Sequence, residues 1–338
     1  MCGLRVVNSL PVEGWHEFLA GNANSNIFHT PEIFEVFAET TGLQPALWAV
    51  VDEESCPKAL LLPVQISLFS GPLHSLSTRN VVYGSVIWDQ DQPGLDAIEL
   101  LLHTYASQAR GKALFTELRN LGDLADVQPA LQRHGFQYAD HLNYLIDLNR
   151  TPEALMRSIG ARTRKNIRRA LRDRKVVIEE LTDEHQLKPW YEVLQQTYRN
   201  ARVPLADLSL FQAAYEILQP KGMIRFTQAR VGTAIAATSV ELLYRDVVYG
   251  WYGGIDRRLR TYDANELLMW HILAWGAEHG YTTYDFGGAG VPGQAYGPRD
   301  FKAKFHGRLV NYGRNTLISA PARLWLSKAA YAVYRQFI

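Results

Sequence analysis

The chain has 338 residues, 47% of them hydrophobic and 20% charged, with 35 basic and 34 acidic side chains. At about 100–200 residues per domain, this length predicts two domains or one large one. The apolar fraction excludes intrinsic disorder, collagen-like sequence and coiled coil. Two cysteines, Cys2 and Cys56, are too few for a disulfide framework. No run approaches the roughly 18 consecutive apolar residues of a membrane span, and residues 1–10 lack the pattern of a secretion signal, so we expect a cytoplasmic protein.

Charge is unevenly distributed along the chain. Residues 157–175 hold nine basic side chains and one acidic one, Asp173. Like charges three and four residues apart destabilise a helix. A polyanionic partner, such as RNA phosphate, a nucleotide pyrophosphate or an acidic membrane, would offset this repulsion. The segment is therefore a candidate anion-binding site, with a plain solvated helix face as the alternative.

The predicted elements of the first half alternate between helices and strands. Helical spacing of apolar residues predicts helices over 31–41, 95–110 and 123–134. Strand-like runs occupy 47–51, 59–67, 81–88, 113–118 and 136–148. Thr151 followed by Pro152 is typical of a helix start, so we expect a domain boundary close to residue 150.

The second half repeats this order. Helices are predicted over 153–173, 184–200, 208–218 and 264–279, and strands over 223–229, 234–243, 246–252, 282–286 and 309–312. Asp263 followed by Glu266 predicts a capping box at the start of the helix 264–279. Two carboxylates in that first turn disfavour an anion there. The shared order of elements suggests a weak internal repeat and an α+β fold with two similar domains.

Known catalytic motifs are scarce. The ten histidines show no metal-ligand spacing and the cysteines form no pair, so we expect no metal site. The glycine-rich loop 287–297 follows a strand but lacks the opening of a dinucleotide-binding helix. We therefore expect no tightly bound cofactor.

Two motifs resemble a known family. Residues 280–288, Gly-Tyr-Thr-Thr-Tyr-Asp-Phe-Gly-Gly, and 301–307, Phe-Lys-Ala-Lys-Phe-His-Gly, resemble the end of the Fem-type transferases. Residues 164–170 look like the basic helix of the same family, and the likeness covers most of 25–315. One position departs from the pattern, because His306 stands between Phe305 and the glycine that normally follows directly.

The resemblance implies two GNAT-like domains, each a mixed, mainly antiparallel sheet flanked by helices. The first would span 1–149 and the second 150–315, followed by a helical tail, 316–338. It also implies an N-acyltransferase that moves an aminoacyl or acyl group to a primary amine of a cell-envelope or peptidoglycan precursor. The donor would be aminoacyl-tRNA or acyl-CoA, with no DNA partner, and the aromatic, cationic tail is a candidate for peripheral contact with the inner face of the membrane.

The resemblance also assigns roles to residues. Lys302 matches the family lysine that handles the donor and its reacting carbonyl, which agrees with stabilisation of an oxyanion by a lysine beside a glycine loop. From the residues themselves, Asp285 could orient the attacking amine or accept its proton, and Glu117, at the parallel place in the first half, could do the same. The alternative for Asp285 is that it merely caps the glycine turn. The expected phosphate-binding residues are Arg164, Lys165, Arg168 and Arg169, and the expected pocket residues are Tyr252, Gly287, Gly288, Phe301 and Phe305.

Two other functions stay open. One is a coenzyme A-dependent acetyltransferase that acts on an amino sugar or a small-molecule amine. The other is a nucleic-acid-binding protein whose transferase site has decayed. Transfer from a thioester alone would favour the former, and tight RNA binding without transfer would favour the latter.

Overall fold

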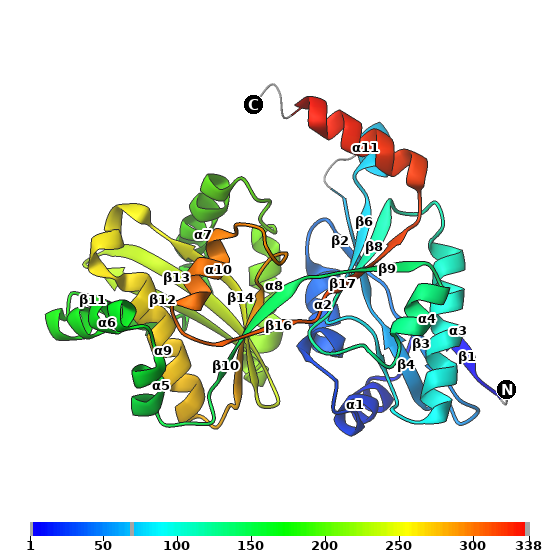
Figure 1. The fold of residues 1–338 in the computed structure, drawn as a ribbon, viewed down its shortest axis with the longest axis horizontal. Helices are drawn as coiled ribbons and strands as arrows, with labels where there is room; N and C mark the ends of the chain where they lie inside the picture. The colour runs from blue at the N-terminus through cyan, green and yellow to red at the C-terminus, as the bar shows by residue number, and fades with distance from the viewer. Residues whose placement is uncertain (1–2, 68–70, 335–338) are drawn as a thin grey trace. The chain divides into compact units, whose positions relative to one another are not determined.

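A computed structural model describes residues 3–67 and 71–334, which form two compact units (Figure 1). Unit 1 comprises Met1–Asp140 and Tyr312–Ile338, and unit 2 comprises His141–Asn311. Cys2 lies outside the described residues.

The limits of the units differ from the expected boundaries near 150 and 315 because of strand pairing. β10 (Leu142–Asp147) pairs with β15 (Thr283–Gly288) and β16 (Arg308–Asn311) inside unit 2. β17 (Arg314–Ile318) pairs with two strands of unit 1, so the residues that follow unit 2 return to the first unit.

Unit 1 contains two sheets. The smaller has the order β1-β3-β4-β7 and the larger the order β2-β5-β6-β8-β17-β9. The strands are β1 (Arg5–Val7), β2 (Leu43–Pro45), β3 (Trp48–Val51), β4 (Pro57–Leu61), β5 (Pro63–Ile66), β6 (Arg79–Tyr83), β7 (Ile87–Trp88), β8 (Phe115–Arg119) and β9 (Phe136–Ala139).

Helices pack on both faces of the smaller sheet. The helices of unit 1 are α1 (Val12–Gly21), α2 (Pro31–Glu39), α3 (Gln92–Ala109), α4 (Gln128–Arg133) and α11 (Pro321–Tyr334), with short 3-10 turns at η1 (Ile27–His29) and η2 (Gly71–Leu76). Leu60 packs with residues of α1, whereas the next residue, Leu61, packs with residues of α3. This alternation follows from the two-residue period of a strand. α4 is shorter than the predicted helix 123–134, because residues before it form turns in which Asp123 accepts the N–H of Ala125.

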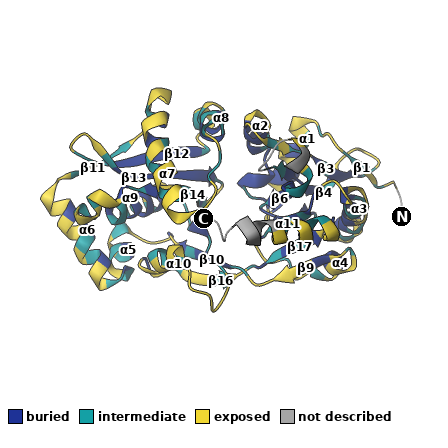
Figure 2. Ribbon diagram, turned by 90° about the horizontal axis from the view of Figure 1, so that it is seen from above, coloured by how far each residue is buried: buried dark blue, intermediate teal, exposed yellow. Residues whose placement is uncertain are grey.

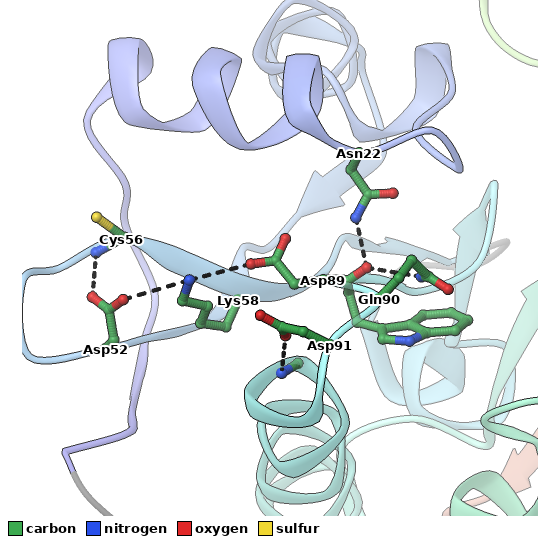
Figure 3. Close-up of polar contacts among 9 residues, drawn as sticks. Asn22, Asp52, Cys56, Lys58, Asp89, Gln90 and Asp91 are labelled. Carbon is green, nitrogen blue, oxygen red and sulfur yellow. Dashed lines mark hydrogen bonds and ion pairs between the residues drawn. The ribbon is translucent and has the colours of Figure 1, made fainter.

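Short polar contacts hold the end of the β3–β4 hairpin and the start of α3 (Figure 3). Asp91 caps α3 by accepting the N–H of Gly94 at 2.8 Å. The Lys58 ammonium lies 3.6 Å from Asp52 and 3.3 Å from Asp89. Asp52, Asp89 and Asp91 therefore each have a structural partner.

Unit 2 is built on a single sheet with the order β11-β12-β13-β14-β15-β10-β16. Its remaining strands are β11 (Val176–Glu180), β12 (Ile224–Val231), β13 (Ala234–Tyr244) and β14 (Val247–Ile255). The predicted antiparallel meander is confirmed as β12–β14, whose neighbours pair antiparallel. β15 then pairs parallel to β14.

The helices of unit 2 cover both faces of this sheet. They are α5 (Pro152–Ser158), α6 (Ala161–Asp173), α7 (Leu187–Ala201), α8 (Leu208–Leu218), α9 (Ala264–Glu278) and α10 (Gly297–Ala303), with 3-10 turns at η3 (Glu184–Gln186), η4 (Gln219–Lys221) and η5 (Arg257–Tyr262). α9 packs with α5 and α6 over β12 and β13, while Trp190 of α7 packs against Phe211 of α8 and Phe226 of β12 on the opposite face.

Two predictions for these helices differ in outcome. The buried helix 264–279 is confirmed as α9. The single helix predicted over 153–173 is wrong, because the chain breaks at Ile159 and Gly160 into α5 and α6. At the break, the N–H of Gly160 donates to the carbonyl of Lys304 at 3.1 Å. The predicted helix start is confirmed, since Thr151 accepts the N–H of Ala154.

Candidate active site

A cavity of about 560 Å³ lies inside unit 2, where β14 and β15 separate. The two strands pair only from Val247 to Tyr249 on β14 and from Thr283 to Asp285 on β15. Beyond these residues both strands line the cavity, together with parts of β13, α7, α9 and α10. The far half of β14 therefore pairs on one edge with β13 and presents its other edge to the cavity.

Local irregularities in β14 and β15 allow this separation. Trp251 is an extra residue in β14, because Val240 pairs with Tyr252 while the next residue pairs with Gly250. Such a bulge bends a strand and increases its twist. Gly287 has a φ of +66°, and a Cβ there would lie 2.8 Å from the Tyr249 hydroxyl oxygen. Only glycine fits this position without displacing the tyrosine.

Aromatic side chains form much of the cavity wall. They are Tyr198, Tyr249, Trp251, Tyr252, Tyr284, Phe286, Tyr296 and Phe301. Burial raises the pKa of Tyr198 to about 12, so its hydroxyl stays protonated at neutral pH. A wall of this kind combines a large apolar surface with polar hydroxyl groups.

Lys302 lines the cavity from α10. Its Nζ donates to the carbonyl oxygens of Phe286 at 2.6 Å and of Gly288 at 2.7 Å. An ammonium has three donors, so one is left for another acceptor. Burial lowers the pKa of Lys302 to about 8, against the charge of Asp285, which raises it. A lysine held in this way can offer both positive charge and a proton near neutral pH.

Asp285 lies at the end of the paired part of β15 but does not line the cavity. Its side chain is buried, and Oδ1 accepts the N–H of Gly287 at 2.6 Å. Burial raises the pKa of Asp285 to about 6, with the Gly287 bond and the charge of Lys302 acting in the opposite direction. The hydrogen bond is the one that a cap of the glycine turn would make, and a role in the reaction stays a prediction.

Four of the five expected pocket residues line the cavity: Tyr252, Gly287, Gly288 and Phe301. Phe305 does not. It is only 1% exposed and packs in the core, with its ring 5.4 Å from that of Phe301 and 6.0 Å from that of Phe286. Its position follows from the turn after α10, which directs this ring toward β15 instead of the cavity.

The four expected phosphate-binding residues lie on α6 and outside the cavity lining. Arg164 donates to the carbonyl of Arg157 at 2.6 Å and so caps α5. Arg169 pairs with Asp263 at the start of α9. Lys165 and Arg168 are exposed, and the described residues offer neither a charged partner. Figure 2 shows α6 largely in the colour of exposed residues. Two of the four cations therefore hold the fold, and two are available to an anion.

The predicted capping box at the start of α9 is wrong. Asp263 makes no side-chain capping bond, and its carboxylate instead receives the Arg169 guanidinium. Glu266 pairs with the Lys304 ammonium at 2.8 Å. The two carboxylates that we expected to disfavour an anion at this helix start are thus each paired with a cation.

Glu117 lies in unit 1, on β8. Its carboxylate pairs with Arg119 at 2.8 Å and with Arg314 of β17 at 3.1 Å, and these cations lower its pKa against the effect of burial. The pairing joins two neighbouring strands and gives Glu117 a structural role.

Sequence patterns did not reveal several polar residues of the cavity. Thr197 of α7, Ser239 of β13 and Asn265 of α9 all line it. Single polar residues in amphipathic helices and strands give no signal of their own, because they are equally common on solvated faces. The tertiary structure alone brings them together.

The described part of the chain shows neither a cluster of possible metal ligands nor a helix able to span a membrane. It has no group of three or more histidine, cysteine, aspartate or glutamate side chains placed to hold a metal ion. None of its helices combines the length and the apolar composition that a membrane-spanning segment needs.

Comparison with known proteins identifies the fold. Residues 157–303 match the family model of an acetyltransferase (GNAT) domain. No curated protein sequence matches the chain. A crystal structure of FemX is similar over 95% of this chain and 99% of its own, with 15% identity and a TM-score of 0.72.

Two further structures share the fold over both units. A tandem GNAT protein from the clavulanic acid biosynthesis pathway is 12% identical and covers 94% of this chain and 99% of its own, with a TM-score of 0.59. L-PGS from Bacillus licheniformis is 14% identical and covers 95% and 97%, with a TM-score of 0.58. The expectation of two GNAT-like units with a Fem-like fold is confirmed.

Proposed function

We propose a specific reaction for this chain, which carries an acetyltransferase (GNAT) domain in a Fem-like fold and is an acyltransferase. The protein transfers an acyl or aminoacyl group from an activated donor to a primary amine, and the acceptor is a cell-envelope precursor. One observation carries this proposal: Lys302 lies in the cavity between the separated strands, anchored on two carbonyl oxygens.

The chemistry needs little beyond positioning and charge. An ester or thioester is already activated, so an amine can attack its carbonyl carbon directly, without a covalent enzyme intermediate. Negative charge develops on the carbonyl oxygen as the C–N bond forms. The free N–H of the Lys302 ammonium can stabilise this oxyanion in a partly desolvated site, where such interactions are strong.

Two observations bear on the donor. The open edge of β14 presents backbone N–H and C=O groups to the cavity. An extended chain with amide groups, such as the pantetheine arm of coenzyme A, can hydrogen-bond to an edge of this kind. The exposed cations Lys165 and Arg168 suit a phosphate-bearing donor of either kind, a coenzyme A thioester or an aminoacyl-tRNA.

A cell-envelope precursor as acceptor would place the reaction at the cytoplasmic face of the membrane. Residues exposed on α11 include Trp325, which is 69% exposed, and Leu326, which is 50% exposed, close to Arg323 and Lys328. Aromatic and aliphatic side chains next to cations are typical of peripheral membrane contact. This supports α11 as the surface that meets lipid-linked precursors.

The test offers acetyl-CoA and alanyl-tRNA separately with a peptidoglycan-precursor peptide that has a free amine. We expect transfer from one donor, with Lys302→Ala lowering kcat by about 10²–10³-fold. Lys304→Ala is the matched control, because this lysine is two residues away and pairs with Glu266 outside the cavity. Equal activity of the two variants would contradict the role of Lys302, and tight RNA binding without transfer would favour a nucleic-acid-binding protein.

A further inference from the structure

Glu241 on β13 is a buried carboxyl group that the proposed reaction does not yet use. Its side chain is 0% exposed, and one oxygen, Oε1, accepts a hydrogen bond from the hydroxyl of Ser239. The other oxygen, Oε2, has no hydrogen-bond partner in the described part of the chain. A buried carboxyl with one oxygen unsatisfied is costly for the fold, which suggests a functional reason for it.

Ser239 connects this carboxyl to the cavity. It lies two residues before Glu241 on the same strand, so both side chains project from one face of the sheet. Ser239 is half-buried and lines the cavity that holds Lys302, whereas Glu241 lies behind the cavity wall. Because the Ser239 hydroxyl donates to Glu241, its oxygen keeps lone pairs that can accept an N–H from a bound amine.

We propose that Ser239 and Glu241 form a proton relay that takes the proton of the attacking amine, an inference that rests on the proposed acyl transfer. Ser239 touches the amine and is the catalytic member of the pair. Glu241 acts through the serine as the final proton acceptor.

The amine nitrogen bonds to the donor carbonyl carbon, and the C=O electron pair moves to the oxygen beside Lys302. The nitrogen loses a proton to the Ser239 oxygen while the Ser239 proton passes to Glu241. The C=O bond then re-forms, and the ester C–O or thioester C–S bond breaks. The leaving atom departs with the bonding pair and takes up one proton, from the same relay or from water.

The surroundings of Glu241 agree with a proton acceptor that works near neutral pH. Burial raises the pKa of Glu241 to about 8, against the Ser239 bond and the charge of Arg225. The charged and titratable groups that face it are Arg225 of β12, Glu180 of β11 and Tyr284 of β15. From α9, His271 lies in the field of the same Arg225 and Glu180. A carboxylate of raised pKa is a stronger base than an exposed one.

The experiment measures kcat/KM against pH with whichever donor, acetyl-CoA or alanyl-tRNA, reacts with the precursor peptide. Wild type should gain activity as the pH rises toward 8. We expect Glu241→Gln and Ser239→Ala to lower kcat/KM by about 10²-fold or more and to lose this rising limb. Lys302→Ala should lower kcat/KM but keep the rise of kcat/KM with pH. The acceptor amine titrates identically in every variant, so differences between the profiles belong to the protein.

A second measurement does not depend on activity. Infrared titration of wild type should show a protonated carboxyl band that disappears near pH 8, is absent from Glu241→Gln and remains in Ser239→Ala. Glu179→Gln, a partly exposed glutamate on β11, is the control and should resemble wild type in both measurements. An unchanged pH profile or an unchanged infrared band in Glu241→Gln overturns the relay alone. Absence of transfer by wild type overturns the proposed function itself.

Discussion

Lys302 and Asp285 show how burial changes the ionisation of single residues. Desolvation disfavours the charged form of each group, which lowers the pKa of the lysine and raises that of the aspartate. The charge of each group favours the charged form of the other, and this offsets part of the desolvation. The result is a lysine whose pKa of about 8 lies close to neutral pH, the range in which a group can best exchange a proton with a reaction.

A pH dependence follows from the Lys302 pKa. The ammonium is the form that stabilises an oxyanion, and it is lost as the pH rises through about 8. We therefore expect kcat to fall above this pH, whereas the Glu241 relay makes it rise below. In Lys302→Arg the guanidinium stays charged, so the falling limb should move to higher pH in a kcat profile. If kcat of Lys302→Arg falls at the same pH as in wild type, the fall belongs to another group.

His29 is a buried residue whose hydrogen bonds define its protonation. Its Nδ1 accepts the N–H of Asn26 at 3.2 Å, and its Nε2 donates to the carbonyl of Ser85 at 3.3 Å. Both ring nitrogens are thus used by the neutral form. Burial lowers the pKa of His29 from 6.5 to about 4.

The stability of the protein should therefore depend on this histidine below pH 6.5. Below pH 6.5 the unfolded chain binds a proton at His29 while the folded chain does not. The free energy of unfolding therefore falls by up to about 3 kcal/mol as the pH is lowered from 6.5 to 4. His29→Gln should be less stable at pH 7 and should lack this part of the pH slope. Denaturant unfolding across the range measures it, and parallel slopes for both proteins would contradict the assignment.

Gly307, which follows the residue that departs from the family motif, lies close to β10. The extra residue, His306, has a φ of +53°, and a Cβ on Gly307 would lie 2.3 Å from the Leu145 carbonyl oxygen on β10. We expect Gly307→Ala to lower the free energy of unfolding by about 1–3 kcal/mol. Gly297→Ala is the control, because nothing lies within 4 Å of its added Cβ. Equal stability of the two variants would show that β16 can move to accept the methyl group.

Among the elements, α6 combines an anchoring face and a free face. Ile167 and Ala170 are buried toward the core, and Arg169 joins the helix to the start of α9 through Asp263. Lys165 and Arg168 are exposed. Cations on one helix can therefore differ in role, depending on the face that they occupy.

Substitutions on α6 should separate these roles. Lys165→Gln with Arg168→Gln should reduce the salt dependence of donor affinity, by about 0.7–0.9 in the log–log slope per lost phosphate contact. Arg169→Gln should instead lower the unfolding midpoint, because the buried Asp263 carboxylate loses its partner. Lys188→Gln, an exposed lysine on α7, controls for net charge. An unaltered salt slope in the double variant would remove α6 from donor binding.

At the level of the whole molecule, the chain path makes unit 1 depend on its last segment. β17 lies between β8 and β9 in the larger sheet of unit 1, and Asn120 bonds to the Tyr312 carbonyl and to Asn315. Unit 1 is thus completed only after all of unit 2 has been synthesised.

Truncation tests this dependence. A chain that ends at residue 311 lacks β17, so we expect hydrogen exchange to show loss of protection in unit 1 and retained protection in unit 2. A chain that ends at residue 320 keeps β17 and lacks only α11, and it should protect both units. Retained protection of unit 1 in the shorter chain would show that its sheet is stable without the strand.

Local patterns in the sequence were sufficient for most elements and for Lys302. The apolar periodicity of α9, the meander β12–β14 and the Thr151 helix start all depend on neighbours within a few residues, which the sequence displays directly. Lys302 could be identified because its short motif beside a glycine-rich loop resembles one of the Fem-type transferases.

The partners of charged and polar groups could be known only from the folded chain. Arg169 pairs with Asp263 across 94 residues, Phe305 turns into the core, and Ser239 meets Lys302 at one cavity although they lie on different elements. Propensity and spacing describe interactions along a segment. Contacts between distant segments depend on how strands pair and separate. No local pattern therefore predicts which cation pairs with a carboxylate or which hydroxyl lines a cavity.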